Sequence, residues 1–138
     1  MEHSEKVCVK RSPGKGRGVF ARKLIAKGEV IERVPVFLIP FKHIVGGKKN
    51  PELAHYFYEW NRGHAALTLG YGSLYNHSYT PNAVYRHGQM AMSYVALRDI
   101  QPGEEITVNY NGDPEGRAPM IFDVVEEGKK GRGKKTAM

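Results

Sequence analysis

A mostly β, turn-rich fold is predicted for this chain of 138 residues from its composition and its local patterns. Its 16 glycines and 8 prolines favour short strands joined by turns over a helical bundle. Hydrophobic residues make up 41% and charged residues 25% of the chain, an ordinary globular composition in which a single domain can bury its own core. No apolar stretch approaches the roughly 20 residues that a membrane span requires, so no membrane is expected as a partner.

Alternating or continuous apolar residues predict the strands of the first half. Residues 7–10 alternate as a first strand, and residues 12–18 are expected to form a glycine-rich turn before the short apolar run 19–21. After a second turn, residues 30–39 have strong strand propensity, and Pro35 predicts an edge or a bend at their centre.

The second half continues the alternation of strands and turns. After an exposed loop, residues 51–61 are expected to begin as a helix and continue as a strand, because Tyr56, Tyr58 and Trp60 alternate. Residues 65–69 are an apolar run that the glycines at 70–72 break. Further strands are expected at 84–85, 90–97 and 106–110, with turns at 86–88 and 101–105 and irregular chain at 73–82. Trp60 is expected to belong to the core.

Charge is distributed unevenly along the chain, whose net charge is +7. Residues 1–50 hold 12 basic and 4 acidic residues, residues 51–128 hold 4 basic and 10 acidic, and residues 129–138 hold 5 basic and none acidic. Because its end is rich in glycine and lysine, we expect residues 126–138 to form a disordered basic tail. Such a tail either aids solubility alone or makes weak, salt-dependent contacts with nucleic acid.

The single cysteine and the start of the chain bear on location. Cys8 has no second cysteine to pair with, which excludes an internal disulfide and favours a reducing compartment. Residues 1–11 carry charges with no apolar run behind them, so no secretory signal is expected. The expected location is cytoplasmic, with the nucleoid or a host nucleus as alternatives.

Several common sites are excluded by spacing. The run GKGRG has neither the glycine spacing of a dinucleotide fingerprint nor the Ser or Thr of a phosphate loop. Six histidines and one cysteine give no zinc set at usable spacing, so no metal is expected. His77 and Ser78 are neighbours whose side chains point opposite ways in extended backbone, which excludes a nucleophile and base pair. Glu104 and Glu105 are expected to be a solvated pair in a turn.

Three sequence blocks occur in one order: SPGKGRGVFARKLIAKGEVIE, ALTLGYGSLYNHSYTPNAVY and ALRDIQPGEEITVNY. They resemble the SET-domain protein lysine methyltransferases, above all the minimal SET proteins of bacteria and large viruses. The resemblance covers residues 7–112 and is carried by NHS, TPN and GEEITVNY. It implies a mostly β SET fold of several short sheets, with few short helices and a knot-like threaded C-terminal segment. We therefore expect a single SET domain over residues 1–125, with 113–125 as a covering segment.

The resemblance implies an enzyme that transfers a methyl group from S-adenosylmethionine to the side-chain amine of a lysine. Such a transfer requires an uncharged amine, a cofactor aligned from the opposite side and little water. The implied cofactor-binding residues are Lys15, Gly16, Arg17, Gly18, Asn76, His77 and Tyr110, with Lys15 at the cofactor carboxylate, Asn76 near its ammonium and His77 near its adenine. Tyr110 aligns with the catalytic tyrosine, and Tyr85, Tyr56 and Tyr71 are implied to line the lysine channel.

The chain departs from the family in having no cysteine cluster after Tyr110. The apolar segment with Met120, Ile121 and Phe122 is expected either to fold back over the site or to pair with a second copy in a homodimer.

The expected substrate is a lysine-rich, histone-like or ribosomal protein. It is predicted to be attracted by an acidic groove formed from Glu52, Glu59, Asp99, Glu104, Glu105, Asp113 and Glu115. Methylation of the chain's own basic tail is a second hypothesis.

Two alternatives to an enzyme are an inactive SET-fold binding module and a small basic nucleic-acid-associated protein that acts through its tail. Retention of Asn76, His77 and Tyr110 favours the enzyme.

Overall fold

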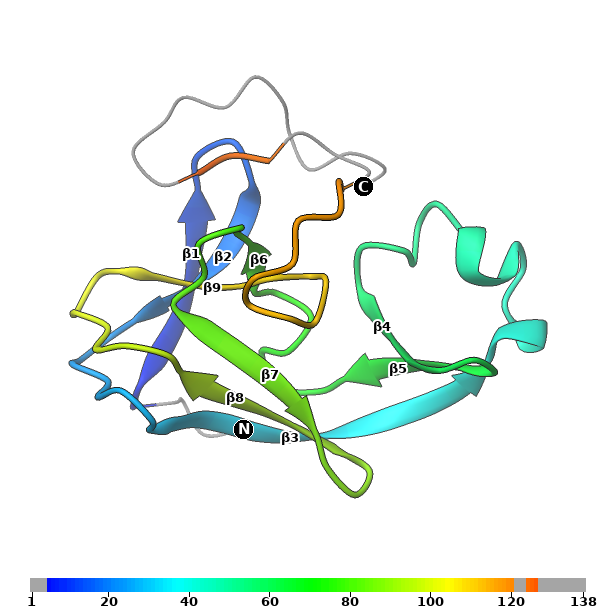
Figure 1. Ribbon diagram of the computed structural model, residues 1–138, viewed down its shortest axis with the longest axis horizontal. Helices are drawn as coiled ribbons and strands as arrows, with labels where there is room; N and C mark the ends of the chain where they lie inside the picture. The colour runs from blue at the N-terminus through cyan, green and yellow to red at the C-terminus, as the bar shows by residue number, and fades with distance from the viewer. Residues whose placement is uncertain (1–4, 121–123, 127–138) are drawn as a thin grey trace.

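Nine strands and two short 3-10 helices make up the described part of the chain, residues 5–120 and 124–126 of a computed structural model (Figure 1). In chain order they are β1 (Val7–Ser12), β2 (Gly16–Ala21), β3 (Val30–Pro40), η1 (Phe41–His43), η2 (Gly47–Lys49), β4 (Phe57–Asn61), β5 (His64–Thr68), β6 (Asn76–His77), β7 (Ala83–His87), β8 (Ala91–Ala96) and β9 (Glu105–Val108). These residues contain no α-helix. The prediction of a mostly β chain with few short helices is confirmed.

The first sheet has the strand order β1-β2-β9-β6. β9 pairs antiparallel with β2 and parallel with β6, where Asn76 lies opposite Thr107 and His77 lies opposite Val108. One sheet therefore joins strands from the three sequence blocks that carry the family resemblance, although those blocks lie far apart in the chain.

The expected turn at residues 12–18 is too long. Gly16 and Gly18 already belong to β2, because Ser12 pairs with Gly16 and Lys10 pairs with Gly18 in the β1–β2 ladder. Only three residues are left for the turn, and Gly14 and Gly16 adopt φ values of 78° and 81° there. Glycine reaches this left-handed region without the steric penalty of a side chain, which is how so short a connection closes.

The second sheet has the strand order β4-β5-β3-β8-β7. β3 pairs with β8 through Val30–Pro35 and with β5 through Val36–Pro40, so the strand changes partner immediately after Pro35. Proline has no N–H to give to a ladder, and this change of partner is a position where none is required. The bend or edge predicted from Pro35 corresponds to this exchange.

Residues 51–56 form turns and not the expected helical start. The side-chain carbonyl of Asn50 accepts the backbone N–H groups of Glu52 and Leu53, a local bond that competes with helix propagation. From Phe57 the chain pairs antiparallel with β5, which confirms the strand predicted for the rest of this segment.

Figure 1 shows the β1–β2 hairpin on one side of the molecule and β4 with the two 3-10 helices on the other, with β6 and β9 between them. The buried core includes Val19, Ile106 and Val108 from the first sheet and Met92 and Tyr94 from the second. Trp60 is partly buried against this core, as predicted.

Two features are absent from residues 5–120 and 124–126. No helix there is long and apolar enough to cross a membrane. No three His, Cys, Asp or Glu side chains there come together in a way that could hold a metal ion.

Candidate active site

A cavity of about 700 Å³ lies beside β4 and the segment that follows β9. Its aromatic lining comprises Tyr56, Phe57, Tyr58, Tyr75, Tyr85 and Tyr110. The volume is within the usual range for small-molecule and side-chain pockets. Of the predicted channel residues, Tyr56 and Tyr85 line this cavity together with Tyr110. Tyr71 is not among its lining residues and packs against the core instead.

Tyr110 is held at both ends. Its hydroxyl donates to the backbone carbonyl of Tyr75 at 2.5 Å, and its backbone N–H donates to Nδ1 of His77 at 2.9 Å. The rings of Tyr110 and His77 lie 5.2 Å apart. Because Tyr75 and His77 flank Asn76, the NHS block fixes the tyrosine predicted to be catalytic.

Burial keeps Tyr58, Tyr85 and Tyr110 of the cavity neutral at physiological pH. Burial raises the pKa of Tyr85 to about 12, and burial also raises the pKa values of Tyr58 and Tyr110. The Tyr85 hydroxyl donates to the backbone carbonyl of Tyr110 at 3.3 Å, and the Tyr58 hydroxyl donates to the carbonyl of Gly72 at 2.7 Å. An uncharged aromatic wall disfavours an ammonium ion and so lowers the pKa of an entering lysine.

A second group of residues, the Glu105 cluster, is formed by Ser12, Lys15, Gly18, Asn76 and Glu105. The Glu105 carboxylate accepts from Ser12 Oγ at 2.8 Å, from Lys15 Nζ at 3.2 Å and from Asn76 Nδ2 at 2.8 Å. A Cβ atom on Gly18 would lie 2.3 Å from Glu105 Oε2 and 2.8 Å from Asn76 Nδ2. Four of the predicted cofactor residues, Lys15, Gly16, Gly18 and Asn76, therefore lie in or beside this cluster.

The expectation that Glu104 and Glu105 form a solvated pair is wrong. The Glu105 side chain is 12% exposed and faces the cluster, whereas the Glu104 side chain is 16% exposed and bonds to Arg98. The two carboxylates therefore have different partners, and neither is fully solvated. Lys15, predicted to meet the cofactor carboxylate, is paired with Glu105.

His77 is 3% exposed, and burial lowers its pKa from 6.5 to about 4. The positive charge of Lys15 adds to this effect, and the carboxylate of Glu126 opposes it. Since Nδ1 accepts the N–H of Tyr110, a neutral His77 carries its proton on Nε2. The ring is therefore a fixed neutral group at physiological pH.

This pKa predicts a specific dependence of stability on pH. Between pH 6.5 and about 4 the unfolded chain binds a proton at His77 that the folded chain does not, so the free energy of unfolding falls as the pH falls through this window. His77→Gln should remove that part of the slope in urea unfolding measured from about pH 7 to about pH 4. His64→Gln is the control, because its ring bonds to Asn61 at the surface. Equal slopes for wild type and His77→Gln would contradict the prediction.

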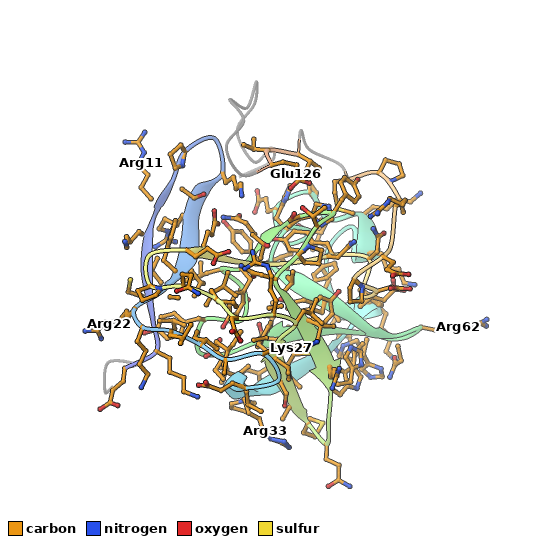
Figure 2. The ribbon with its side chains drawn as sticks, turned by 60° about the vertical axis from the view of Figure 1, so that its left-hand side comes forward. Arg11, Arg22, Lys27, Arg33, Arg62 and Glu126 are labelled. Carbon is orange, nitrogen blue, oxygen red and sulfur yellow. The ribbon has the colours of Figure 1, made fainter. Side chains whose placement is uncertain are left out.

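The segment after Tyr110 folds back beside the site. Pro119 and Met120 line the cavity, and the carbonyl of Ala118 accepts from the hydroxyl of Tyr79 at 2.9 Å. Glu126, labelled in Figure 2, accepts from Ser78 Oγ at 2.7 Å. This arrangement agrees with the fold-back alternative for Met120. The neighbouring positions 121 and 122, and the basic tail beyond 126, lie outside the described residues.

The cavity does not have the predicted acidic lining. All seven of the expected acidic residues lie in the described part of the chain, yet only Glu59 lines the cavity, where it pairs with Lys48 at 2.6 Å. Arg62 also lines the cavity, and Figure 2 shows its side chain pointing away from the molecule. The net charge of a segment therefore does not measure the charge at this cavity.

Three site residues were not singled out from the sequence. Tyr58 follows from the alternation that identified Tyr56 and Trp60, because residues two apart share a strand face. Tyr75 directly precedes the NHS block but contributes through its backbone carbonyl, for which side-chain patterns give no signal. Glu105 had no signal either, because its partner Ser12 lies 93 positions earlier in the chain.

Comparisons with known proteins agree with this geometry. The SET domain family model matches residues 16–111. A Schizosaccharomyces pombe histone-lysine N-methyltransferase, H3 lysine-37 specific, is 35% identical over 70% of this chain and 67% of its own length. Drosophila melanogaster Set2, a histone-lysine N-methyltransferase, is 34% identical over 72% of this chain but only 5% of its own length.

Solved structures share the fold. The crystal structure of a candidate histone methyltransferase of Plasmodium falciparum superposes with a TM-score of 0.67 at 33% identity, covering 78% of this chain and 95% of that one. A chain of an apo PRC2 complex with a mutated Ezh2 superposes with a TM-score of 0.62 at 21% identity, covering 78% of this chain and 15% of that one, which shows the fold alone. From the family match, the relatives and the sheet that unites the three sequence blocks, the chain belongs to the SET-domain family of S-adenosylmethionine-dependent protein-lysine methyltransferases.

Proposed function

We propose that this enzyme methylates a lysine in a basic, histone-like protein, with the lysine entering the aromatic cavity and the cofactor bound beside the Glu105 cluster. The observation that carries the proposal is the place of Tyr110. It lines the cavity, and its backbone is bonded to His77, which directly follows Asn76 of the cluster. The names of the S. pombe and Drosophila relatives support a histone as the type of substrate.

The residues of the Glu105 cluster fit S-adenosylmethionine, which supplies an activated methyl group when bound. Gly18 has no room for a Cβ atom, because the side chains of Glu105 and Asn76 pack directly against its backbone. None of the described residues donates a hydrogen bond to Asn76 Oδ1, which leaves that oxygen as an acceptor for an ammonium. Lys15 offers a positive charge for a carboxylate, and the buried His77 presents a neutral ring for the adenine.

The cavity residues prepare the lysine. Burial among neutral phenols favours the uncharged amine, which then releases its proton to water without a dedicated base. The Tyr110 hydroxyl donates its proton to the Tyr75 carbonyl, so its oxygen is left to accept an N–H of the uncharged amine and to orient that amine toward the cofactor side. Tyr85 and Tyr56 narrow the passage, and we propose that they influence how many methyl groups fit.

The direct test is transfer of a radiolabelled methyl group to a panel of histone-like and ribosomal proteins. Incorporation on lysine, found by mass spectrometry, would support the proposal. Binding of S-adenosylhomocysteine without turnover on any basic protein would favour the inactive binding module instead. Deleting residues 129–138 should leave the transfer reaction intact, whereas a protein that acts through its basic tail would lose its function.

Asn76→Ala is expected to weaken the binding of S-adenosylhomocysteine at least tenfold, about 1.4 kcal/mol. The variant loses the amide that faces the cofactor site, and a hydrogen bond to a charged group contributes about this much. Titration calorimetry measures the affinity, and circular dichroism confirms folding. Unchanged affinity in a folded variant would remove Asn76 from the cofactor site.

Arg62→Glu is expected to raise kcat/KM on lysine-rich peptides about threefold at low salt, through KM, because it replaces a positive charge at the cavity by a negative one. The gain should vanish at high ionic strength, where exposed charges are screened. Arg33→Glu is the matched control, because Figure 2 shows Arg33 on a different side of the molecule. An equal gain in both variants, or none in Arg62→Glu, would show that charge at the cavity does not govern peptide encounter.

A further inference from the structure

We infer that Glu105 is a positioning residue of this enzyme: its carboxylate fixes the Asn76 amide so that Asn76 Oδ1 faces the bound cofactor's ammonium. The inference rests on the proposed cofactor site and adds to it a residue that does not itself touch the cofactor. The first observation is that the side-chain nitrogen of Asn76 donates two hydrogen bonds. Asn76 Nδ2 donates to the backbone carbonyl of Arg17 at 2.8 Å and to Glu105 Oε2 at 2.8 Å.

These two bonds determine which way the amide faces. The amide nitrogen of asparagine has two hydrogens, and here each meets an acceptor that cannot donate in return. Turning the amide over would place Oδ1 against a carbonyl and a carboxylate, with two repulsive contacts in place of two bonds. Asn76 is 2% exposed, so water does not compensate for such a loss. The amide therefore has one orientation, and Glu105 accepts one of the two hydrogen bonds that determine it.

The Glu105 carboxylate is itself held from three other strands. Ser12 of β1 and Lys15 of the β1–β2 turn bind its Oε1 atom, and Gly18 of β2 lies so close that a Cβ atom would be 2.3 Å from Oε2. Asn76 of β6 binds Oε2 from the far side. Because the Glu105 carboxylate is 12% exposed and both of its oxygens have partners, its side chain is restricted to one conformation. The position of the Glu105 carboxylate, and with it the orientation of the Asn76 amide, is therefore set by contacts from the other three strands of this sheet.

Glu105→Gln tests this role, because the variant keeps the length of the side chain but turns part of the acceptor into a donor. We expect the affinity for S-adenosylhomocysteine to fall about tenfold, with kcat at saturating cofactor within about threefold of wild type, since Tyr110 is untouched. Glu104→Gln is the matched control: it removes the same charge from the adjacent residue, which bonds to Arg98 and not to the cluster. Its affinity should equal that of wild type.

A double-mutant cycle separates positioning from general support of the fold. If Glu105 acts through the Asn76 amide, adding Glu105→Gln to Asn76→Ala should cost little further affinity. Losses that multiply would overturn the inference, as would an unchanged affinity in folded Glu105→Gln or equal losses in Glu104→Gln and Glu105→Gln. If Glu105→Gln fails to fold, Ser12→Ala takes its place in the cycle, because it removes one hydrogen bond to the Glu105 carboxylate and leaves the charge of that carboxylate in place. Wild type that binds no S-adenosylhomocysteine would instead refute the proposed cofactor site.

Discussion

Replacing Tyr110 by phenylalanine is expected to lower kcat by about two to three orders of magnitude while cofactor affinity stays close to that of wild type. The change deletes one hydroxyl that donates to the carbonyl of Tyr75 at 2.5 Å and keeps the ring beside His77. The substrate amine then loses its proposed contact with the Tyr110 hydroxyl. The backbone bond from Tyr110 to His77 is retained, so the neighbouring Asn76 should keep its place.

The measurement is single-turnover methyl transfer at saturating cofactor, with S-adenosylhomocysteine affinity from calorimetry. Tyr71→Phe is the matched control, because the same hydroxyl is removed from a tyrosine that does not line the cavity. Full activity of Tyr110→Phe would remove Tyr110 from the mechanism. A comparable loss of kcat in Tyr71→Phe would contradict the conclusion that the effect is specific to a tyrosine that lines the cavity.

Gly18→Ala is expected to weaken cofactor binding about thirtyfold, roughly 2 kcal/mol. The added Cβ would stand 2.3 Å from Glu105 Oε2 and 2.8 Å from Asn76 Nδ2, distances that require both side chains to move. Forcing one carbon into a well-packed site costs about 1 to 3 kcal/mol, and here the groups that must move are those that we propose orient the cofactor.

Gly88→Ala provides the control for Gly18→Ala. A Cβ atom at Gly88 would meet its nearest neighbours, in Arg33 and Ala91, at 3.5 Å or more, which is ordinary contact. Its affinity and melting temperature should match wild type. If Gly18→Ala binds cofactor as well as Gly88→Ala does, the Glu105 cluster is not part of the cofactor site.

The sequence by itself predicted the class of the fold, most strands and the candidate residues of the site. β1, β3, β8 and β9 follow from local alternation or strand propensity, which depends only on neighbouring residues. Asn76, His77 and Tyr110 were identified because NHS, TPN and GEEITVNY are specific in type, order and spacing. The structure places the rings of His77 and Tyr110 beside each other and the Asn76 side chain in the Glu105 cluster, near where the parallel pairing of β6 and β9 joins two of the blocks.

Only the tertiary structure shows which residues from distant parts of the chain contact one another at the candidate site. The roles of Glu105 and Tyr75 depend on partners that a local pattern does not contain: Ser12 lies 93 positions from Glu105, and Tyr75 acts through its backbone. The same holds for charge. The acidic residues of one segment were predicted to line a groove, but Glu104 pairs with Arg98 and Glu105 pairs with Lys15, and neither carboxylate lines the cavity. The net charge of a segment does not record where its side chains point or which partners they meet, so a correct segment charge still misplaced the groove.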